Sequence, residues 1–270
     1  MPDYYNIITE TDPAVVKTIA EVLEVRAADP AQRRMLDAYL GEIAFPQAAR
    51  VLEIGCGTGA VARHLATLPT VAEVVGLDPS PEFIARARQL AVGQPQLAFV
   101  EGSAHDLPFE AGSFDVAIFH TTLCHLSNPE NALQEAFQVL RPGGWLAVFD
   151  GDYASTTLGT HDLDPLQACA ESFRAHFIDD SWIGRLTPKL ASDAGFALTG
   201  YRSHGYTESA SPNYMLTIVD RGADALAAGG RIGRGLAEAL KEEARLRVSE
   251  KRFFGHISYT SLIARKPVQH

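Results

Sequence analysis

A glycine-rich turn directly after a short apolar segment constrains the fold of this chain most strongly. Residues 51–59 read VLEIGCGTG, and residues 61–68 carry apolar side chains at helical spacing. Glycine allows a left-handed backbone and lets a ligand approach the main chain closely. The helix that follows presents unpaired N–H groups at its start. The segment therefore predicts a strand, a ligand-binding turn and a helix, with a tight turn that binds nothing as the alternative.

Short apolar segments and helical patterns continue to alternate beyond this turn. Alternating elements of these lengths are typical of a parallel sheet with helices on both faces. Because the apolar segments are nearly uninterrupted, we expect them to be buried on both sides. The expected strands cover residues 50–54, 71–77, 97–100, 114–119 and 145–149, and the expected helices cover residues 61–68, 82–91 and 130–140.

The flanks of this alternating region are mostly helical. Their apolar periodicity predicts helices rather than further parallel strands. The expected helices are 14–28, 31–41, two within 164–193 that meet near Trp182 and Pro188, and 213–250 with a break at Gly229 and Gly230; two late strands are expected at 196–206 and 256–265. No linker divides the 270 residues, so a single domain is expected.

Composition narrows the class of protein. Acidic residues outnumber basic ones by 33 to 23, for a net charge of −10, which argues against broad nucleic-acid binding. No apolar run approaches the roughly 20 residues that span a bilayer, and the N-terminus does not resemble a signal peptide. The three cysteines, Cys56, Cys124 and Cys169, are too few and too widely spaced for a disulfide framework or a CxxC metal site. We expect a cytoplasmic protein with no membrane contact and no metal.

Two acidic residues indicate what the glycine turn binds. Asp78 ends the second expected strand, where a carboxylate accepts two hydrogen bonds from a ribose diol at about 1.5–3 kcal/mol each. Residues 55–60 also satisfy the dinucleotide pattern G-x-G-x-x-A. Glu53 stands two residues before the first glycine, where it would repel a pyrophosphate. That position favours a ligand with an ammonium group.

Four blocks in a fixed order now resemble a known family, the class I S-adenosylmethionine-dependent methyltransferases, in their ubiquinone- and menaquinone-biosynthesis-like small-molecule branch. The blocks are VLEIGCGTG at 51–59, GLDPSPEFIARAR at 76–88, EGSAHDLPFEAGSFDVAIF at 101–119 and NPENALQEAFQVLRPGG at 128–144. The resemblance covers about residues 50–150. It implies a Rossmann-like α/β fold with a seven-stranded, mostly parallel sheet whose last strand, 256–265, runs antiparallel between 145–149 and 197–206.

The resemblance also implies how the chain is divided. It predicts one methyltransferase domain with an N-terminal helical cap (1–45), a cofactor-binding half (50–150), and an acceptor-binding lid with the final strands (151–270). Helical lid elements are expected at the N-terminus and after the fifth and sixth strands. The cofactor is expected to be S-adenosylmethionine, which leaves as S-adenosylhomocysteine.

The cofactor-binding residues are placed by the same resemblance. Glu53 is expected to orient the loop or bind the amino group, and Asp78 the ribose. Ser103 stands where relatives more often have an aspartate that binds the adenine amino group. Either the backbone of Ala104 therefore contributes more to adenine binding, or the adenine amino group is bound at another position. Arg26 either clamps the methionine carboxylate or is a solvated surface charge. The expected set is Arg26, Glu53, Gly55, Cys56, Gly57, Asp78, Pro79, Ser103, Ala104 and His120.

Candidate catalytic groups follow the fourth and fifth strands. A base that removes a proton from the acceptor contributes about 10²–10⁴-fold in rate. His125 is the first candidate, with capping of the Asn128–Pro129 turn as its structural alternative. His120 either acts as a base or only binds cofactor. Asp150 or Asp152 is a further candidate, unless these carboxylates satisfy loop N–H groups.

The flanking segments are expected to close the site. Tyr4 and Tyr5 are placed to fold over the cofactor, where aromatic rings contact a sulfonium favourably. His176, His204 and Tyr206 fall in the expected lid. So do four large apolar side chains, Phe173, Phe177, Trp182 and Phe196, of which core packing explains at least half.

The sequence thus predicts methyl transfer from S-adenosylmethionine to a small organic metabolite. The alternative is a methyltransferase-like protein that catalyses another reaction, such as a cyclisation, or that serves as a binding module. Such a protein would have the same cofactor-binding loop. A nicotinamide-dependent oxidoreductase would need a second half-sheet and a Tyr-x-x-x-Lys pair, which we do not find. The sequence predicts neither which atom of the acceptor is methylated nor the oligomeric state, and a homodimer is one of the alternatives.

Overall fold

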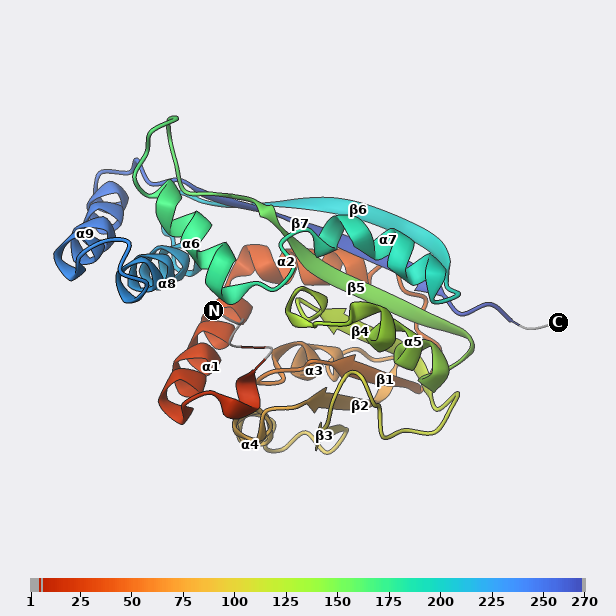
Figure 1. The fold of residues 1–270 in the computed structure, drawn as a ribbon. Coiled ribbons are helices and arrows are strands. Elements are labelled where there is room, and N and C mark those ends of the chain that lie inside the picture. The colour runs from red at the N-terminus through yellow and green to blue at the C-terminus, as the bar shows by residue number, and fades with distance from the viewer. Residues whose placement is uncertain (1–4, 6, 269–270) are drawn as a thin grey trace.

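A seven-stranded sheet forms the centre of the molecule (Figure 1). The computed structural model describes residue 5 and residues 7–268. The strand order is β3-β2-β1-β4-β5-β7-β6, and every pairing is parallel except those of β7, which is antiparallel to both β5 and β6. The strands are β1 (Ala49–Ile54), β2 (Val71–Asp78), β3 (Leu97–Glu101), β4 (Phe114–His120), β5 (Leu140–Thr157), β6 (Ala197–Glu208) and β7 (Gly255–Arg265). The expected fold and the antiparallel last strand are confirmed.

Helices cover both faces of this sheet. In Figure 1, α5 and α7 lie in front of the strands, while α2 and α3 lie behind them. The helices are α1 (Pro13–Ala28), α2 (Pro30–Leu40), α3 (Ala60–Leu65), α4 (Pro81–Leu90), α5 (Pro129–Val139), α6 (Gln167–Phe177), α7 (Ile183–Asp193), α8 (Tyr214–Ala228) and α9 (Arg234–Ser249), with short 3-10 turns at Ile8–Glu10 and Leu123–His125. Asp12 caps α1 by accepting from the Ala14 N–H, and Pro13 occupies the first helical turn, as expected.

The strand register determines where a site can form. Ile54 at the end of β1 pairs with Leu77 of β2 and with Phe119 of β4, and His120 pairs with Phe149 of β5. The residues that follow these strands therefore emerge side by side at one edge of the sheet. In open α/β sheets this carboxyl edge is where ligands bind.

One strand is much longer than the sequence suggests. The expected strand at residues 145–149 is the middle of β5, which continues to Thr157. Its extension pairs with β7 through Asp152 and again at Thr157, opposite His256. The polar residues after Phe149 give a local signal typical of a loop, so this prediction was too short. The partner that makes them a strand lies about a hundred residues further along the chain.

Two pairs of helices interrupt the sheet strands late in the chain, and of these α6, α8 and α9 project beyond one end of the sheet while α7 packs on it (Figure 1). α6 and α7 follow β5, and α8 and α9 follow β6, as expected for the lid. The break between α8 and α9 falls at Gly229 and Gly230, as predicted, and Gly230 has a φ of +68°. Pro188 lies inside α7 rather than at the junction before it. A buried ion pair of 2.5 Å between Arg247 and Asp164 ties α9 to the segment before α6.

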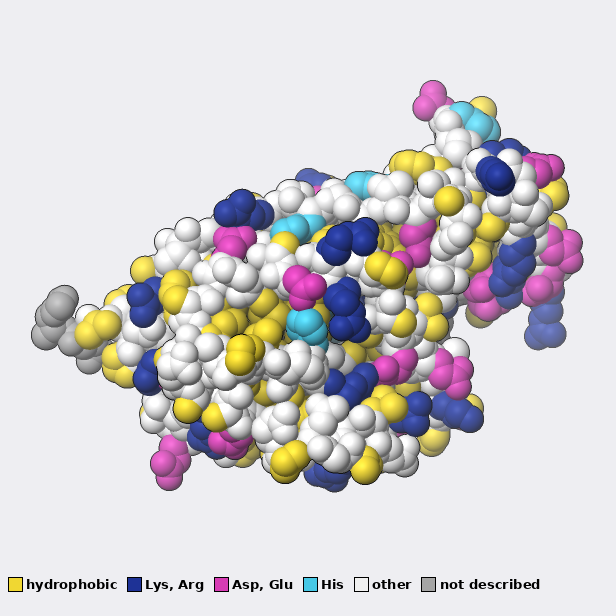
Figure 2. All heavy atoms as spheres, turned by 180° about the vertical axis from the view of Figure 1, so that it is seen from behind, with side chains coloured by type: hydrophobic (Ala, Val, Ile, Leu, Met, Phe, Trp, Pro, Cys, Tyr) yellow, Lys and Arg dark blue, Asp and Glu magenta, His cyan; other side chains and the backbone are white. Residues whose placement is uncertain are grey.

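The charge distribution does not form a basic surface on the face seen in Figure 2, where acidic and basic side chains are interspersed. At the α8–α9 end, Lys241 pairs with Asp224 and Glu238, and Arg245 pairs with Asp220. Among the described residues, no helix has the length and apolar character needed to cross a membrane.

Candidate functional site

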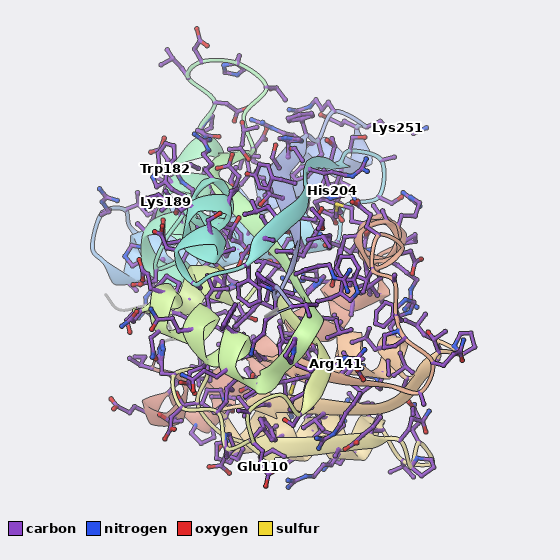
Figure 3. The ribbon with its side chains drawn as sticks, turned by 90° about the vertical axis from the view of Figure 1, so that its right-hand side faces the viewer. Glu110, Arg141, Trp182, Lys189, His204 and Lys251 are labelled. Carbon is purple, nitrogen blue, oxygen red and sulfur yellow. The ribbon has the colours of Figure 1, made fainter. Side chains whose placement is uncertain are left out.

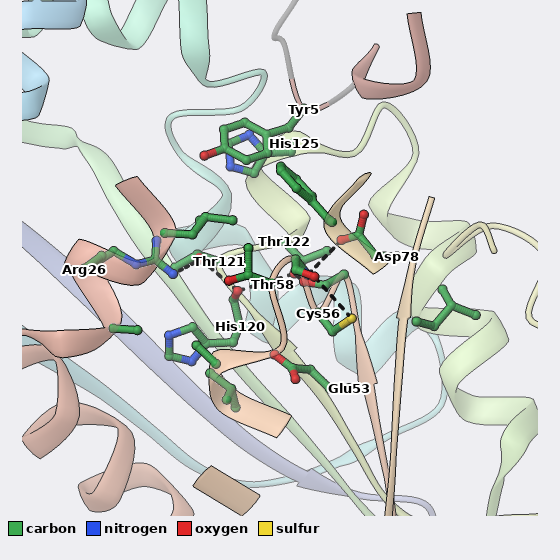
Figure 4. Close-up of a pocket in the computed structure, with 18 of the residues that line it drawn as sticks. Tyr5, Arg26, Glu53, Cys56, Thr58, Asp78, His120, Thr121, Thr122 and His125 are labelled. Carbon is green, nitrogen blue, oxygen red and sulfur yellow. Dashed lines mark hydrogen bonds between the residues drawn. The ribbon is translucent and has the colours of Figure 1, made fainter. Parts of the chain in front are cut away.

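A cavity of about 670 Å³ opens at the carboxyl edge of the sheet. Its walls come from α1 and α2, from the segments after β1, β2 and β3, and from the end of β4 (Figure 4). All ten residues expected to bind the cofactor line this cavity: Arg26, Glu53, Gly55, Cys56, Gly57, Asp78, Pro79, Ser103, Ala104 and His120. Their individual roles stay predictions, but the structure brings them together.

The glycine turn takes the left-handed backbone that its sequence predicts. The φ angles of Gly55, Gly57 and Gly59 are +74°, +53° and +75°. A Cβ added at Gly55 would lie 2.3 Å from Cγ2 of Thr122. One added at Gly57 would lie 3.0 Å from Cδ1 of Leu23. The turn therefore requires glycine even without a ligand, because its own neighbours fill the space of a side chain.

Asp78 holds the glycine turn from the neighbouring strand. One carboxylate oxygen accepts from the Gly57 N–H at 2.8 Å, and the other accepts from the Ser80 N–H at 2.9 Å. Burial raises the pKa of Asp78 to about 6, and these two backbone hydrogen bonds oppose that rise. A carboxylate oxygen has more than one lone pair, so Asp78 retains acceptor capacity toward the cavity.

Glu53 is a second buried carboxyl, at the end of β1. Its side chain is only 2% exposed, and its Oε2 has no hydrogen-bond partner among the described residues. Burial, reinforced by the negative charge of Asp78, raises the pKa of Glu53 to about 8. A buried oxygen without a partner carries a desolvation cost of about 1–3 kcal/mol. A ligand that donates to this oxygen would remove that cost.

The opposite wall of the cavity carries a guanidinium. Arg26 of α1 is half-buried and donates from Nη2 to Oγ1 of Thr121 at 2.6 Å (Figure 4). Among the described residues it forms no ion pair, so its charge is not neutralised by a carboxylate. Arg26 is therefore not a solvated surface charge, which was the alternative interpretation of this residue. Thr121 itself has a φ of +53°, which is strained for a β-branched residue.

His120 lies beneath this arginine at the end of β4. Its Nδ1 and the hydroxyl of Tyr39 are hydrogen-bonded at 3.0 Å, and its ring stacks on Phe149 with centroids 4.7 Å apart. Burial, with a further contribution from Arg26, lowers the pKa of His120 well below its usual value. The imidazole is therefore neutral at neutral pH.

The adenine-side candidates differ in their surroundings. Ser103 is exposed, and its hydroxyl accepts from the His105 N–H at 3.1 Å, while Ala104 is buried.

The thiol of Cys56, in the glycine turn, is buried. Burial raises the pKa of this thiol well above its usual range, which makes it a poor nucleophile.

His125 and the N-terminal segment meet at the mouth of the cavity. Both His125 and Tyr5 line it, and their rings stack with centroids 4.2 Å apart (Figure 4). The leading segment therefore folds over the cavity through Tyr5. Tyr4 lies outside the described residues.

The two aspartates proposed as bases are placed elsewhere. Neither Asp150 nor Asp152 lines the cavity. Asp150 is fully buried and accepts from the backbone N–H groups of Gly151 and Cys124, which is the structural alternative stated for it. Asp152 pairs with Arg185 of α7 at 2.8 Å. Because β5 continues as a paired strand here, Asp152 does not turn into the cavity, and this expectation needs correcting.

The lid residues also lie apart from the cavity. His176 donates to the Ser172 carbonyl, and His204 on the edge strand β6 bonds with Ser261. Trp182 is 52% exposed beside α7 (Figure 3). Phe173 and Phe196 pack in the core, and Phe177 stacks on Phe173. None of these four apolar side chains lines the cavity. Packing accounts for Phe173, Phe177 and Phe196, which agrees with the expectation of at least half.

Several cavity residues were not foreseen from the sequence. Glu24 of α1 pairs with Arg63 of α3 at 2.8 Å and accepts from the hydroxyl of Thr58, which fixes α1 over the glycine turn. Thr122 donates to the Ile54 carbonyl at 3.1 Å. For Thr121 and Thr122, the only signal in the sequence was their position directly after the fourth strand. Within the described part of the chain, no cluster of three or more metal-ligating side chains occurs.

Comparison with known proteins shows which family this chain is similar to. The sequence profile described as "Methyltransferase domain" matches residues 52–148. An uncharacterized methyltransferase from Synechocystis is 36% identical over 171 residues, which cover 62% of this chain and 74% of that protein. An uncharacterized 37.1 kDa protein of a Streptomyces fradiae transposon is 37% identical over 164 residues, 60% of this chain and 46% of its own length. This chain spans about half the length of the first curated relatives it matches.

The fold has close counterparts among solved structures. The YcgJ protein of Bacillus subtilis superposes with a TM-score of 0.62 at 20% identity, over 88% of this chain and 100% of that one. At this level of identity the match concerns the fold alone.

Proposed function

This chain belongs to the class I S-adenosylmethionine-dependent methyltransferases, and we propose that it transfers a methyl group from S-adenosylmethionine to a small organic metabolite in the cytoplasm. The chain would act as a single methyltransferase domain with the N-terminal cap, cofactor-binding half and acceptor-binding lid expected from the sequence. Its three cysteines lie within the described residues, are buried and form no disulfide, which suits a reducing compartment.

One observation carries the cofactor assignment. The cavity holds two ionisable groups that lack a matching partner among the described residues: the buried carboxyl of Glu53, whose Oε2 has no hydrogen-bond partner, and the guanidinium of Arg26, which forms no ion pair. The amino-acid end of S-adenosylmethionine offers an ammonium and a carboxylate, which complement these two groups. Asp78, on the adjacent strand, retains lone pairs for a ribose diol. The residues present therefore fit the cofactor.

The chain's contribution to catalysis would be alignment and exclusion of water. When bound, S-adenosylmethionine supplies a methyl group that its positive sulfur already activates. Leu23 of α1 lies over Gly57, and the Glu24–Arg63 pair holds that helix in place. Such fixing of a reactant is worth more than general acid–base chemistry when the reacting group is already activated.

His125 and His120 remain the candidates for a base. Both line the cavity, and His120 is neutral because burial lowers its pKa. Its Nδ1 is engaged by Tyr39, so proton transfer would use Nε2. His125 lies at the mouth under Tyr5, where an acceptor would pass.

Two features support a small acceptor. α1 and Tyr5 contribute to the wall of the cavity on one side, and basic side chains form no stripe on the face seen in Figure 2. A relative from Saccharomyces cerevisiae, 35% identical over 103 residues, is named as a sterol 24-C-methyltransferase. This resemblance supports a small-molecule acceptor here.

The test uses cofactor labelled in its methyl group. Purified protein is titrated with S-adenosylhomocysteine by calorimetry and then incubated with metabolite extracts and labelled cofactor, followed by mass spectrometry of labelled products. We expect saturable binding and a labelled small molecule. Binding without any labelled product would favour the alternative, a cyclisation or a binding role. Absence of binding would reject both.

A further inference from the structure

Gln32 is a buried polar residue in the wall of the cavity for which the cofactor assignment leaves no role. It lies in the first turn of α2, where the Asp29 carboxylate accepts from its backbone N–H. Its side chain is only 6% exposed, although it lines the cavity. A glutamine so placed is held rigidly and faces a ligand rather than bulk water.

The amide of Gln32 is only half satisfied. Its Nε2 donates to the hydroxyl of Tyr259 at 3.4 Å, while its buried Oε1 has no hydrogen-bond partner among the described residues. Turning the amide over would let Oε1 accept from Tyr259 but would leave Nε2 without an acceptor. In either orientation one buried polar atom of a residue that lines the cavity has no hydrogen-bond partner among the described residues.

The position of Tyr259 shows which end of the cavity this is. Asp78 ends β2, Glu53 ends β1, His120 ends β4, and Tyr259 lies on β7 opposite Gly151 of β5. The strand order places β7 four strands from β2, a separation of roughly 19 Å at the usual strand spacing. Gln32 is therefore at the end of the cavity remote from the ribose-binding carboxylate, beyond the histidine.

The side chains that hydrogen-bond to the Gln32 amide and to Tyr259 are uncharged. Tyr259 is fully buried, and Tyr153 and Tyr214 are also buried nearby, all three close enough to Arg26 to interact with it electrostatically. Among the described residues, Gln32 is hydrogen-bonded to the Asp29 carboxylate through its backbone N–H alone, and no carboxylate is hydrogen-bonded to the Gln32 amide or to the Tyr259 hydroxyl. This end of the cavity therefore suits an uncharged hydrogen-bonding group on an otherwise apolar molecule.

We propose that Gln32 is a specificity-determining residue that recognises the acceptor, and that the acceptor is a small molecule with an uncharged O–H or N–H donor, such as a phenol, enol or aromatic amine. The proposal rests on the methyltransferase function above and names its substrate class. An acceptor without such a donor would leave the Gln32 oxygen unpaired, and sites of this kind discriminate strongly against analogues that lack the group.

The test compares two probes of equal size, 4-fluorophenol and 4-fluorotoluene, which differ by a hydroxyl and a methyl group. Binding to the protein loaded with S-adenosylhomocysteine is followed by fluorine NMR. We expect wild type to prefer the phenol by about tenfold or more. Gln32→Leu should abolish that preference and leave S-adenosylhomocysteine affinity within about twofold. Gln134→Leu, an exposed glutamine of α5, is the matched control and should behave as wild type.

Each outcome decides the proposal. Equal binding of both probes by wild type, no binding of the phenol, or an unchanged preference in Gln32→Leu would overturn it. So would a loss of S-adenosylhomocysteine affinity in Gln32→Leu, because Gln32 would then belong to the cofactor site. Gln32→Met, with an unbranched side chain of similar length, replaces Gln32→Leu if the latter does not fold. If wild type fails to bind S-adenosylhomocysteine at all, the methyltransferase function itself is at fault.

Discussion

The guanidinium of Arg26 and the hydroxyl of Thr121 are joined by a 2.6 Å hydrogen bond between the N-terminal helix and the end of β4. Thr121 makes this contact from a left-handed backbone conformation with a φ of +53°. Its N–H also donates to the Phe149 carbonyl at 2.6 Å, and its hydroxyl donates to the His120 carbonyl at 2.7 Å. Strain of this kind persists where surrounding contacts enforce it, often at functional sites.

Thr121→Gly separates the strain from the hydrogen bond. Glycine adopts positive φ without the cost of a Cβ, so we expect the melting temperature to be no lower than that of wild type. Loss of the hydroxyl frees Arg26, and S-adenosylhomocysteine affinity should fall by about twofold to tenfold. Calorimetry and thermal unfolding measure the two effects. Reduced stability with unchanged affinity would show that Thr121 is purely structural.

Glu53 should make cofactor binding depend on pH. Its pKa in the free protein is about 8, while a bound ammonium favours the carboxylate. Affinity for S-adenosylhomocysteine should therefore rise with pH up to about 8, by at most tenfold per unit, and level off above it. Below about pH 6, protonation of Asp78 should steepen the fall. In Glu53→Gln the dependence above pH 6 should vanish, as titration calorimetry across this range would reveal.

The same carboxyl should affect the stability of the free protein. Because its pKa is raised from 4.5 to about 8 on folding, the folded state holds the proton more tightly, and stability falls as pH rises between these values. Glu53→Gln should remove this component of the decline. Chemical unfolding of both proteins at several pH values tests the sign. A steeper decline in the variant would contradict the assignment.

Asp78→Ala should weaken cofactor binding by a few kcal/mol, the value of about two hydrogen bonds to a charged group. Because Asp78 also accepts from Gly57 and Ser80, the variant should lose some stability as well. Asp162→Ala, at an exposed position before α6, serves as the control. Unchanged affinity in a folded Asp78→Ala protein would exclude this residue from the site.

His125→Ala should lower kcat by about 10²-fold or more if His125 is the base. His176→Ala and His204→Ala should have little effect, because neither side chain lines the cavity. Steady-state kinetics with the identified acceptor distinguish these cases. A loss of tenfold or less, with a parallel fall in melting temperature, would support a packing role under Tyr5.

Local signals were enough to predict the alternation of strands and helices and the strand ends at which Glu53, the glycines and Asp78 lie, whereas the seven-stranded sheet with an antiparallel last strand was implied by the family resemblance. Glu53, the glycines and Asp78 directly follow buried strands, and parallel pairing brings such positions to one edge. Signals of this kind failed where the partner is remote in sequence. Asp152 follows an apolar strand and yet belongs to a longer one, because β7 pairs with it.

Single polar residues on helices were harder to interpret. Gln32 has the spacing of an ordinary helical residue, and only the packing of α2 against β7 buries it. The aromatic side chains of the expected lid show the opposite case. Their apolar character suggested an acceptor pocket, but none of them lines the cavity. Burial and partner choice depend on how elements meet, which the order of residues along one helix does not encode.

The two ends of the cavity have different origins in the chain. The loop with Glu53 and Asp78 lies within residues 52–148, the part shared with the family, whereas Arg26, Gln32 and Tyr259 lie outside it. Substitutions in α2 and β7 can thus alter the remote end without replacing a residue of the glycine turn or of the helix that covers it. In evolutionary terms, the two parts of the cavity can diverge independently, so relatives with the same turn can be recruited to different acceptors.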